Sequence, residues 1–228
     1  MGEDIALEAS DGHELRAYRA SPAGKPNGGI VVLQEIFGVN AHIREVADGF
    51  SASGYLVLAP SLYDRSSRKN VRLGYSEDDI VEGRRLREEF SSEDSIRDVG
   101  AAADALRSEN LKVGVVGYCW GGSIAFLAAV RLPLDAAVVY YGGQIMPHVN
   151  ERELCPLLMH FGSRDASIPL SDVEAIRNAH PDAAVHLYDA DHGFNCNYRS
   201  QFDQSASTLA RERTLAFFAS HLARMGPK

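Results

Sequence analysis

Apolar residues follow two different patterns along the chain, and together these patterns predict most of its secondary structure. Short continuous apolar runs are typical of strands buried on both faces of a sheet. Stretches with an apolar residue at every third or fourth position predict amphipathic helices. We expect strands at 29–33, 55–59, 112–116, 135–141, 154–161 and 184–188, and helices at 40–53, 78–90, 93–108, 123–130 and 202–224.

The predicted strands and helices alternate. This order predicts an α/β fold with a mostly parallel central sheet and helices on both faces. Before it, residues 5–18 predict an antiparallel hairpin around an Asp-Gly turn. The Pro- and Gly-rich stretch 21–29 and the polar stretch 61–74 are expected to be loops. No repeat, linker or low-complexity segment interrupts the pattern, so residues 1–228 are expected to form a single domain.

Composition narrows the classes of function. With 45% hydrophobic residues in 228, the chain can build a sizeable core. A net charge of −8 without a basic patch argues against a nucleic-acid partner. No apolar run is long enough for a membrane span, and the start of the chain lacks a signal-peptide pattern, so a cytoplasmic location is expected. Three widely spaced cysteines argue against a disulfide framework.

Residues 117–122 carry the clearest chemical motif. They read GYCWGG and lie between a predicted strand and a predicted helix. This is the setting of the nucleophile elbow G-x-S-x-G, with Cys119 in the serine position. Small flanking residues are needed because the nucleophile sits at strained backbone angles. Cys119 is therefore predicted to attack an electrophilic carbon such as an acyl carbonyl. The motif by itself also allows a buried core cysteine beside a glycine turn.

Two further residues complete a triad in the expected chain order of nucleophile, acid and histidine. Asp165 and His192 each follow a predicted strand closely, and open α/β sheets place their sites at such strand ends. His192 is predicted to act as the base and Asp165 to orient it. Taken singly, Asp165 could be a turn residue and His192 a loop histidine. Asp189 and Asp191 are rivals for the acid but stand too close to His192 in sequence.

The other cysteines and histidines have weaker claims. Cys155 and His160 are expected in the core, and Cys196 is expected near the pocket without being a second nucleophile. No cluster of histidine and acidic residues has metal-ligand spacing. We therefore expect no metal and no cofactor.

Five short motifs occur in one order along most of the chain: QEIFGVN at 34–40, GYCWGG at 117–122, YYG at 140–142, GSRD at 162–165 and DHGF at 191–194. With these motifs the chain resembles the dienelactone hydrolase (carboxymethylenebutenolidase) family of α/β-hydrolases. The resemblance implies the α/β-hydrolase fold and a carboxylic ester hydrolase of aromatic compound degradation.

The resemblance also implies roles for three more residues. Glu35 would lie beside the resting thiol and help to deprotonate Cys119. The residues alone say only that an acidic side chain directly after a buried strand is unusual, and a solvated loop carboxylate is the alternative. The backbone N–H groups of Ile36 and Trp120 would form the oxyanion hole. The position of Trp120 at a helix start agrees, because donors point outward there.

The predicted reaction opens an enol-lactone or dienelactone, or cleaves a small activated ester, through a thioester acyl-enzyme. Thiolates expel basic leaving groups poorly, so an enolate suits Cys119 better than an amine. Candidate substrate-binding residues are Arg84, Arg85, Arg199, Tyr141 and Phe37.

Dienelactone as the substrate depends on arginines that would bind its carboxylate. The family's arginine a few residues after the histidine is absent here or displaced to Arg199. Arg65, Arg68 and Arg72 also stay open for this role, although such residues are more often solvated surface charges. Broader ester or lactone specificity is therefore an alternative.

Two further hypotheses come from other classes of function. One is an esterase, thioesterase or promiscuous phosphoester hydrolase that uses the same Cys119. The other is a non-catalytic ligand-binding or redox-sensing protein, which would not need Asp165 and His192 in register. The expected partner is a small-molecule ester or lactone, and the expected state is a monomer or small homo-oligomer.

Overall fold

The computed structural model describes residues 2–223 and contains one eight-stranded sheet with the order β1-β2-β4-β3-β5-β6-β7-β8. From β4 onward along this order the strands run parallel, and β2 is antiparallel to both of its neighbours, β1 and β4. The predicted, mostly parallel sheet is confirmed. The strands are β1 (Glu3–Glu8), β2 (Glu14–Ala20), β3 (Gly29–Leu33), β4 (Leu56–Pro60), β5 (Val113–Tyr118), β6 (Ala136–Tyr140), β7 (Leu157–Gly162) and β8 (Ala184–Tyr188).

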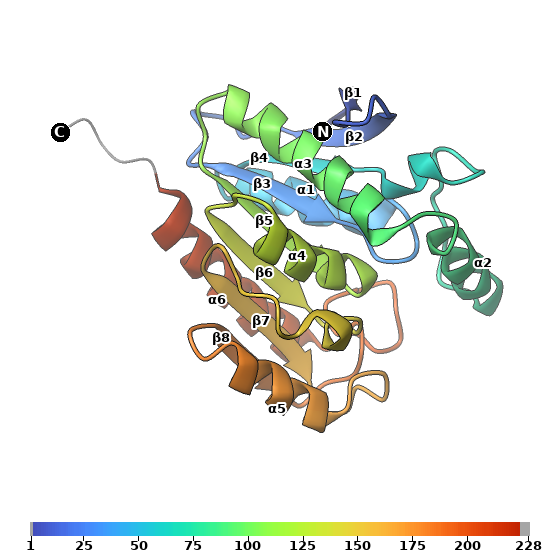
Figure 1. The fold of residues 1–228 in the computed structure, drawn as a ribbon, viewed down its shortest axis with the longest axis vertical. Coiled ribbons are helices and arrows are strands. Elements are labelled where there is room, and N and C mark those ends of the chain that lie inside the picture. The colour runs from blue at the N-terminus through green and yellow to red at the C-terminus, as the bar shows by residue number, and fades with distance from the viewer. Residues whose placement is uncertain (1, 224–228) are drawn as a thin grey trace.

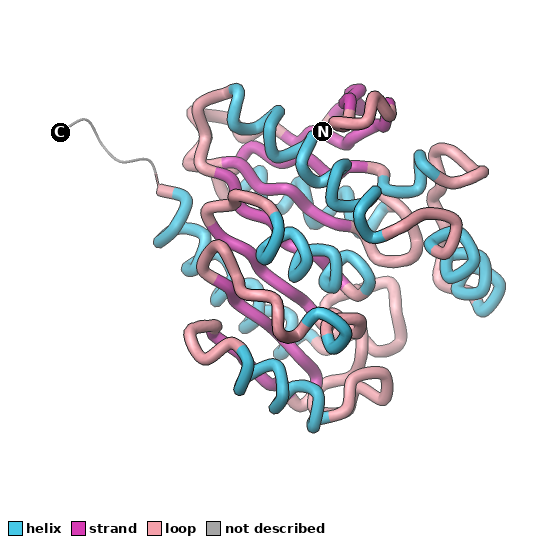
Figure 2. The backbone as a smooth tube through the Cα atoms, viewed as in Figure 1, coloured by secondary structure: helices cyan, strands magenta, loops and turns pink. Residues whose placement is uncertain are grey.

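Helices cover both faces of this sheet, as predicted. Figure 1 shows α3, α4 and α5 on the near face and α1 and α6 behind it. Figure 2 shows the strands as a single twisted layer between these helices. The α-helices are α1 (Ala41–Ala52), α2 (Glu77–Arg87), α3 (Ser92–Ser108), α4 (Trp120–Arg131), α5 (Leu170–Ala179) and α6 (Gln204–Leu222).

The helices on both faces of the sheet determine which strands form the buried core. Every residue of β3, β4, β5, β6 and β7 is buried, because helices pack on both faces. Strands β1 and β8 lie at the two edges and are partly exposed. The central strands therefore hold their carboxyl ends in fixed positions, where loops can carry a site.

Three local features differ from the sequence-based expectation. Helix α5 was not predicted; it buries only Val173 and Ile176, so its apolar pattern is too sparse to read. Strand β7 begins at Leu157, because Pro156 lacks the N–H that a ladder needs. The expected loop 61–74 contains a short 3₁₀ helix, Leu62–Arg65. Met1 and residues 224–228 lie outside the described residues, including Arg224, the last residue of the helix predicted at 202–224.

Helix α2 has an unusual place. It lies beyond the edge of the sheet toward which the strand arrows point, apart from the two helical layers (Figure 1). It buries only Gly83 and Leu86. No helix within residues 2–223 combines the length and apolar character that crossing a membrane requires.

Candidate active site

Cys119 joins the end of β5 to the start of α4, and its backbone is strained. Its φ of 54° and ψ of −118° lie in a region that residues with a side chain rarely adopt, at a cost of roughly 1–3 kcal/mol. The Cys119 N–H donates a hydrogen bond to the carbonyl of Tyr140 on β6, with an N···O distance of 3.0 Å. The buried strand and helix on either side hold the conformation, so the thiol is presented at the carboxyl edge of the sheet.

Two glycines allow this sharp turn. A Cβ on Gly117 would lie 1.9 Å from the carbonyl oxygen of Gly121, and a Cβ on Gly121 would lie 2.4 Å from the carbonyl oxygen of Gln34. Both clashes are with backbone atoms, which cannot rotate away. The predicted strand–turn–helix context of the GYCWGG motif is thus present in the structure.

His192 lies between Cys119 and Asp165. Its Nε2 is 3.1 Å from Cys119 Sγ, and its Nδ1 is 2.7 Å from Asp165 Oδ2. The Asp165 side chain is fully buried, and its other oxygen accepts a hydrogen bond from the Ser167 N–H at 2.8 Å. The three residues come from loops after β5, β7 and β8. The structure therefore brings together the three residues that the motifs selected.

The charges in this chain of contacts favour a protonated ring. Burial alone would lower the pKa of His192, but the nearby Cys119 thiolate and the Asp165 carboxylate raise it to about 10. Both anions stabilise the imidazolium through direct contacts. The contacts on both sides of the ring therefore favour the imidazolium form of His192.

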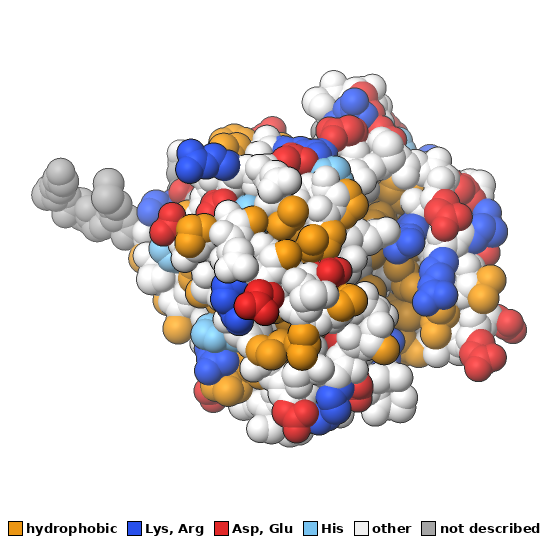
Figure 3. Space-filling view, turned by 60° about the horizontal axis from the view of Figure 1, so that its bottom comes forward, with side chains coloured by type: hydrophobic (Ala, Val, Ile, Leu, Met, Phe, Trp, Pro, Cys, Tyr) orange, Lys and Arg blue, Asp and Glu red, His pale blue; other side chains and the backbone are white. Residues whose placement is uncertain are grey.

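A cavity of about 500 Å³ opens in front of Cys119 and His192. Figure 3 shows a hollow with apolar side chains at its base and basic side chains at its edge. The polar and apolar residues that line the cavity include Ile36, Phe37, Ile80, Arg84, Arg87, Trp120, Gln144, Arg164, Ser167, Arg199 and Gln201.

The N–H groups of Ile36 and Trp120 are available as donors. Both residues line the cavity, and neither N–H donates a hydrogen bond within the described part of the chain. Tyr63 holds both residues in place. Its hydroxyl lies 2.9 Å from the Ile36 carbonyl oxygen and 2.8 Å from that of Gly83 on α2, and its ring stacks on Trp120 at 5.5 Å. Tyr63 lies outside every motif of the sequence and was not among the predicted site residues.

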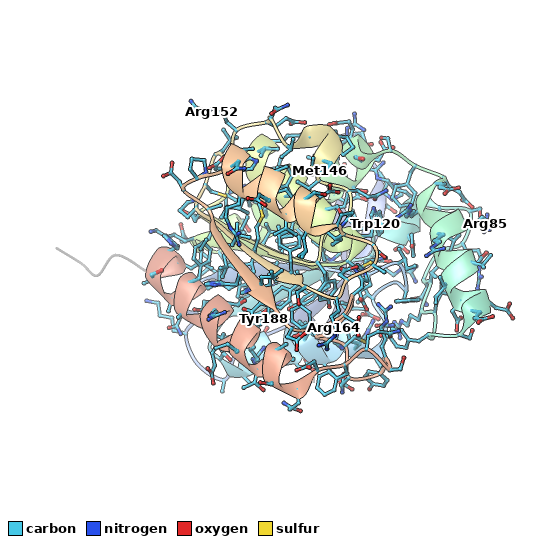
Figure 4. The ribbon with its side chains drawn as sticks, turned by 90° about the horizontal axis from the view of Figure 1, so that it is seen from below. Arg85, Trp120, Met146, Arg152, Arg164 and Tyr188 are labelled. Carbon is cyan, nitrogen blue, oxygen red and sulfur yellow. The ribbon has the colours of Figure 1, made fainter. Side chains whose placement is uncertain are left out.

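Arginines on α2 face the cavity from one side of the helix. Arg84 and Arg87 line the cavity and form no ion pair with any described residue. Arg85 instead pairs with Glu82 and Glu89 and lies on the outer side of α2, away from Trp120 (Figure 4). The expectation for Arg85 is therefore corrected, because adjacent helical residues point in different directions. Helical spacing from Arg84 would have found Arg87.

A further arginine that was not among the sequence-based candidates also faces the cavity. Arg164 lines the cavity and carries an ion pair with Asp189 at its rim. Arg65, Arg68 and Arg72 are held by acidic partners elsewhere and do not line it.

Glu35 contacts an arginine in this structure. Its side chain is 1% exposed, and its Oε1 lies 3.5 Å from Arg199 Nη1. Its Oε2 has no hydrogen-bond partner among the described residues. Burial alone would lower the pKa of Arg199, but the charge of Glu35 raises it. Arg199 thus lies between Glu35 and the cavity and could interact with either a buried carboxylate or a bound anion.

The remaining candidates lie close to the triad. Phe37 lines the cavity, whereas Tyr141 is buried behind it with its ring 5.1 Å from that of His192. Cys196 is fully buried and does not line the cavity. His160 is buried as predicted and contacts the hydroxyls of Tyr188 and Thr214.

Comparison with known proteins identifies the family. The profile of the dienelactone hydrolase family matches residues 15–222. A carboxymethylenebutenolidase from Pseudomonas putida is 36% identical, over 96% of this chain and 97% of the relative. The chain belongs to the dienelactone hydrolase family. As a member of this family, it is a carboxylic ester hydrolase with the α/β-hydrolase fold.

Solved structures agree with this assignment. A dienelactone hydrolase candidate from Klebsiella pneumoniae is 31% identical, with a TM-score of 0.81 over 95% of this chain and 99% of the other. A dienelactone hydrolase from Anabaena variabilis is 19% identical with a TM-score of 0.70, over 97% and 98% of the two chains, and it shows the shared fold.

Proposed function

We propose that this dienelactone hydrolase family member opens enol-lactones or cleaves small activated esters through Cys119, His192 and Asp165. The observation that carries the proposal is the continuous contact from Cys119 Sγ through the His192 ring to Asp165. His192 can take up the proton that the Cys119 thiol loses, and the resulting thiolate is a strong nucleophile.

In the first half-reaction the Cys119 thiolate attacks the carbonyl carbon and forms a carbon–sulfur bond. The oxyanion that develops is stabilised by the N–H groups of Ile36 and Trp120. As the carbon–oxygen bond breaks, His192 gives its proton to the leaving oxygen. The products are a thioester on Cys119 and, for a lactone, an enol that rearranges to its keto form while still attached.

In the second half-reaction water cleaves the thioester. Acylation removes the negative charge of the thiolate, which lowers the pKa of His192 and leaves the ring free to act as a base. His192 takes a proton from the attacking water, and the intermediate collapses with loss of the Cys119 thiolate. The acid product leaves, and the thiolate–imidazolium pair is restored.

The arginines at the cavity favour a substrate that carries a carboxylate. Arg84 and Arg87 offer guanidinium groups without an acidic partner, and Arg199 is shared with Glu35. A substrate carboxylate bound by Arg199 would compete with Glu35 for the same guanidinium. Released in this way, Glu35 could accept a proton near the nucleophile, which is the role proposed for it.

The test compares a dienelactone with p-nitrophenyl acetate for the wild type and Cys119→Ala. Loss of both activities in Cys119→Ala, and a thioester-linked acyl group on Cys119 detected by mass spectrometry after rapid quenching, are expected. Cys155→Ser is the matched control, because Cys155 is buried but lies outside the cavity. Turnover by Cys119→Ala at the wild-type rate would overturn the proposal.

The two substrates also separate the dienelactone specificity from a broader one. Efficient turnover of the dienelactone supports carboxylate binding by the cavity arginines. Turnover of the aryl ester alone would favour the second candidate, an esterase for neutral acyl groups.

A further inference from the structure

A second group of reactive side chains is buried behind the active site. Glu35, His42 and Cys196 each offer a ligand atom, and these atoms all lie within 4.8 Å of one another. The three residues are 1%, 3% and 0% exposed. They are far apart in sequence, and only the fold brings them together, so spacing along the chain could not reveal the group.

Two polar atoms of this group lack a partner. Neither Glu35 Oε2 nor His42 Nε2 forms a hydrogen bond with any described residue, and both atoms are buried. An unpaired buried polar atom costs roughly 1–3 kcal/mol. Such atoms beside a buried thiol indicate that the group can accept an additional occupant.

We propose that Glu35, His42 and Cys196 form a binding site for a thiophilic divalent cation such as Zn²⁺, and that the bound ion inhibits the enzyme. The donor set contains one sulfur, one imidazole nitrogen and one carboxylate oxygen, which are the ligand types that zinc accepts. Magnesium and calcium prefer oxygen ligands throughout, so a thiol disfavours them.

The charge and proton balance is compatible with this ion. When the sulfur–metal bond forms, the thiol proton of Cys196 leaves to solvent. The resulting thiolate and the Glu35 carboxylate then neutralise a divalent cation, with His42 neutral and water as a fourth ligand. Arg199 keeps its contact with Glu35 Oε1, so the ion binds through the unpartnered Oε2. The positive charge of that guanidinium repels a cation and so opposes binding.

The geometry requires only a small adjustment. Tetrahedral zinc ligands with bonds of about 2.0–2.3 Å lie roughly 3.5 Å apart. Closing from 4.8 Å or less needs a movement of the ligand atoms of about an ångström. A separate hollow of about 440 Å³, lined by His42, Asn195 and Asn197, offers a way in. It shares no lining residue with the catalytic cavity.

Inhibition is expected because Glu35 would be both a ligand of the ion and the proton acceptor near Cys119. An ion on its Oε2 would prevent this carboxylate from turning toward the nucleophile. This part of the inference rests on the role proposed for Glu35 in hydrolysis. The binding part does not, because it can be measured in a protein without Cys119.

The experiment uses Co²⁺ as a spectroscopic probe of the full-length Cys119→Ala protein. Removing Cys119 is necessary because its thiolate and His192 could themselves bind a metal. Coordination through Cys196 should give a thiolate-to-cobalt absorption band in the near ultraviolet, together with intense visible bands of tetrahedral cobalt. The additional change Cys196→Ser should abolish the ultraviolet band, and Cys155→Ser should leave it intact. His42→Gln should weaken cobalt binding, because it removes the proposed nitrogen ligand.

Circular dichroism of each variant shows whether it is folded, so loss of binding cannot be confused with loss of structure. A folded Cys119→Ala protein without the ultraviolet band, or a band that survives Cys196→Ser, would overturn the site. In the second measurement, Zn²⁺ should inhibit the otherwise unmodified enzyme reversibly, a chelator should restore the rate, and Cys196→Ser should abolish the inhibition. Inhibition that persists in Cys196→Ser would arise at Cys119 and His192 and would overturn the regulatory part. Cobalt binding without zinc inhibition would overturn the regulatory part. Activity of Cys119→Ala itself reports separately on the proposed catalytic function.

Discussion

The turn that carries Cys119 and helix α2, which carries Arg84 and Arg87, both contribute to the same cavity but are built in opposite ways. Strand β5 is buried throughout, and α4 is buried from Trp120 to Val130. Helix α2 buries only Gly83 and Leu86 and begins with a capping box on the surface. The proposed chemistry thus depends on backbone that has no room to move, whereas the proposed substrate selection depends on exposed side chains.

This difference predicts how amino-acid substitutions should affect folding and activity in each region. In the turn, an added methyl group meets backbone atoms, so substitution acts on folding as well as on rate. On α2, a side chain can change without disturbing a core. Substitutions of the arginines on α2 that face the cavity should therefore alter which substrates are accepted and leave the stability of the fold nearly unchanged.

The largest effect is expected from Gly121→Ala. The new Cβ would lie 2.4 Å from a backbone oxygen of Gln34, so we expect destabilisation of more than about 4 kcal/mol, or no folded protein. Urea unfolding followed by circular dichroism measures this. Gly100→Ala in α3 is the matched control, because its Cβ would approach only Leu132 Cδ2, at an ordinary contact distance of 4.0 Å. It should stabilise the protein by about 0.5–1 kcal/mol. A Gly121→Ala protein as stable as the wild type would contradict the rigid turn.

A smaller effect on folding but a large one on rate is expected from Asp165→Asn. The neutral amide no longer stabilises the imidazolium, so kcat/KM should fall by roughly 10³-fold. The His192 pKa should also fall, because one of the two anions that raise it is removed. Side-chain NMR of His192 measures this shift. The wild-type ring should stay protonated through neutral pH and lose its proton near pH 10.

The same NMR titration of Cys119→Ala supplies the control. Removing the thiolate also lowers the His192 pKa, because burial then opposes the charge with only Asp165 to offset it. A ring that titrates alike in all three proteins would show that no thiolate–imidazolium pair exists.

The smallest effect is expected from Arg87→Ala. It should raise KM for a carboxylate-bearing lactone by about tenfold, which corresponds to roughly 1.4 kcal/mol, and leave a neutral aryl ester unaffected. Arg85→Ala is the matched control, because its neighbours on the outer side of α2 are Glu82 and Glu89. Steady-state kinetics with both substrates separate the cases. Equal effects of the two variants would show that the direction of the arginine does not matter.

The sequence predicted the strands and the three contacting residues because both leave local patterns. Continuous apolar runs mark strands covered on two faces, and Cys119, Asp165 and His192 each stand directly after such a run or close to its end. The order of strands in the sheet then brings these loops together. The same reasoning could not supply the distances between these three residues, or the position of Arg199 between Glu35 and the cavity.

What escaped prediction depends on contacts between distant segments. Helix α5 has too few buried residues to show a period. Tyr63 lies in an expected loop, and its importance comes from two carbonyls that are far away in sequence. Arg85 was named as a candidate and Arg87 was not, because direction around a helix was not considered. Each case needs the packing of one segment on another, which a local pattern does not encode.

The shared hydroxyl of Tyr63 has a consequence for altering this enzyme by design. Because one phenol group contacts both the carbonyl of Ile36 and that of Gly83, the helix that would recognise the substrate is fastened to the loop that would stabilise its oxyanion. A designer who shifts α2 to admit a larger acyl group would also displace the Ile36 N–H. Exchanging arginines on α2 while keeping its backbone in place is therefore the safer route to a new specificity.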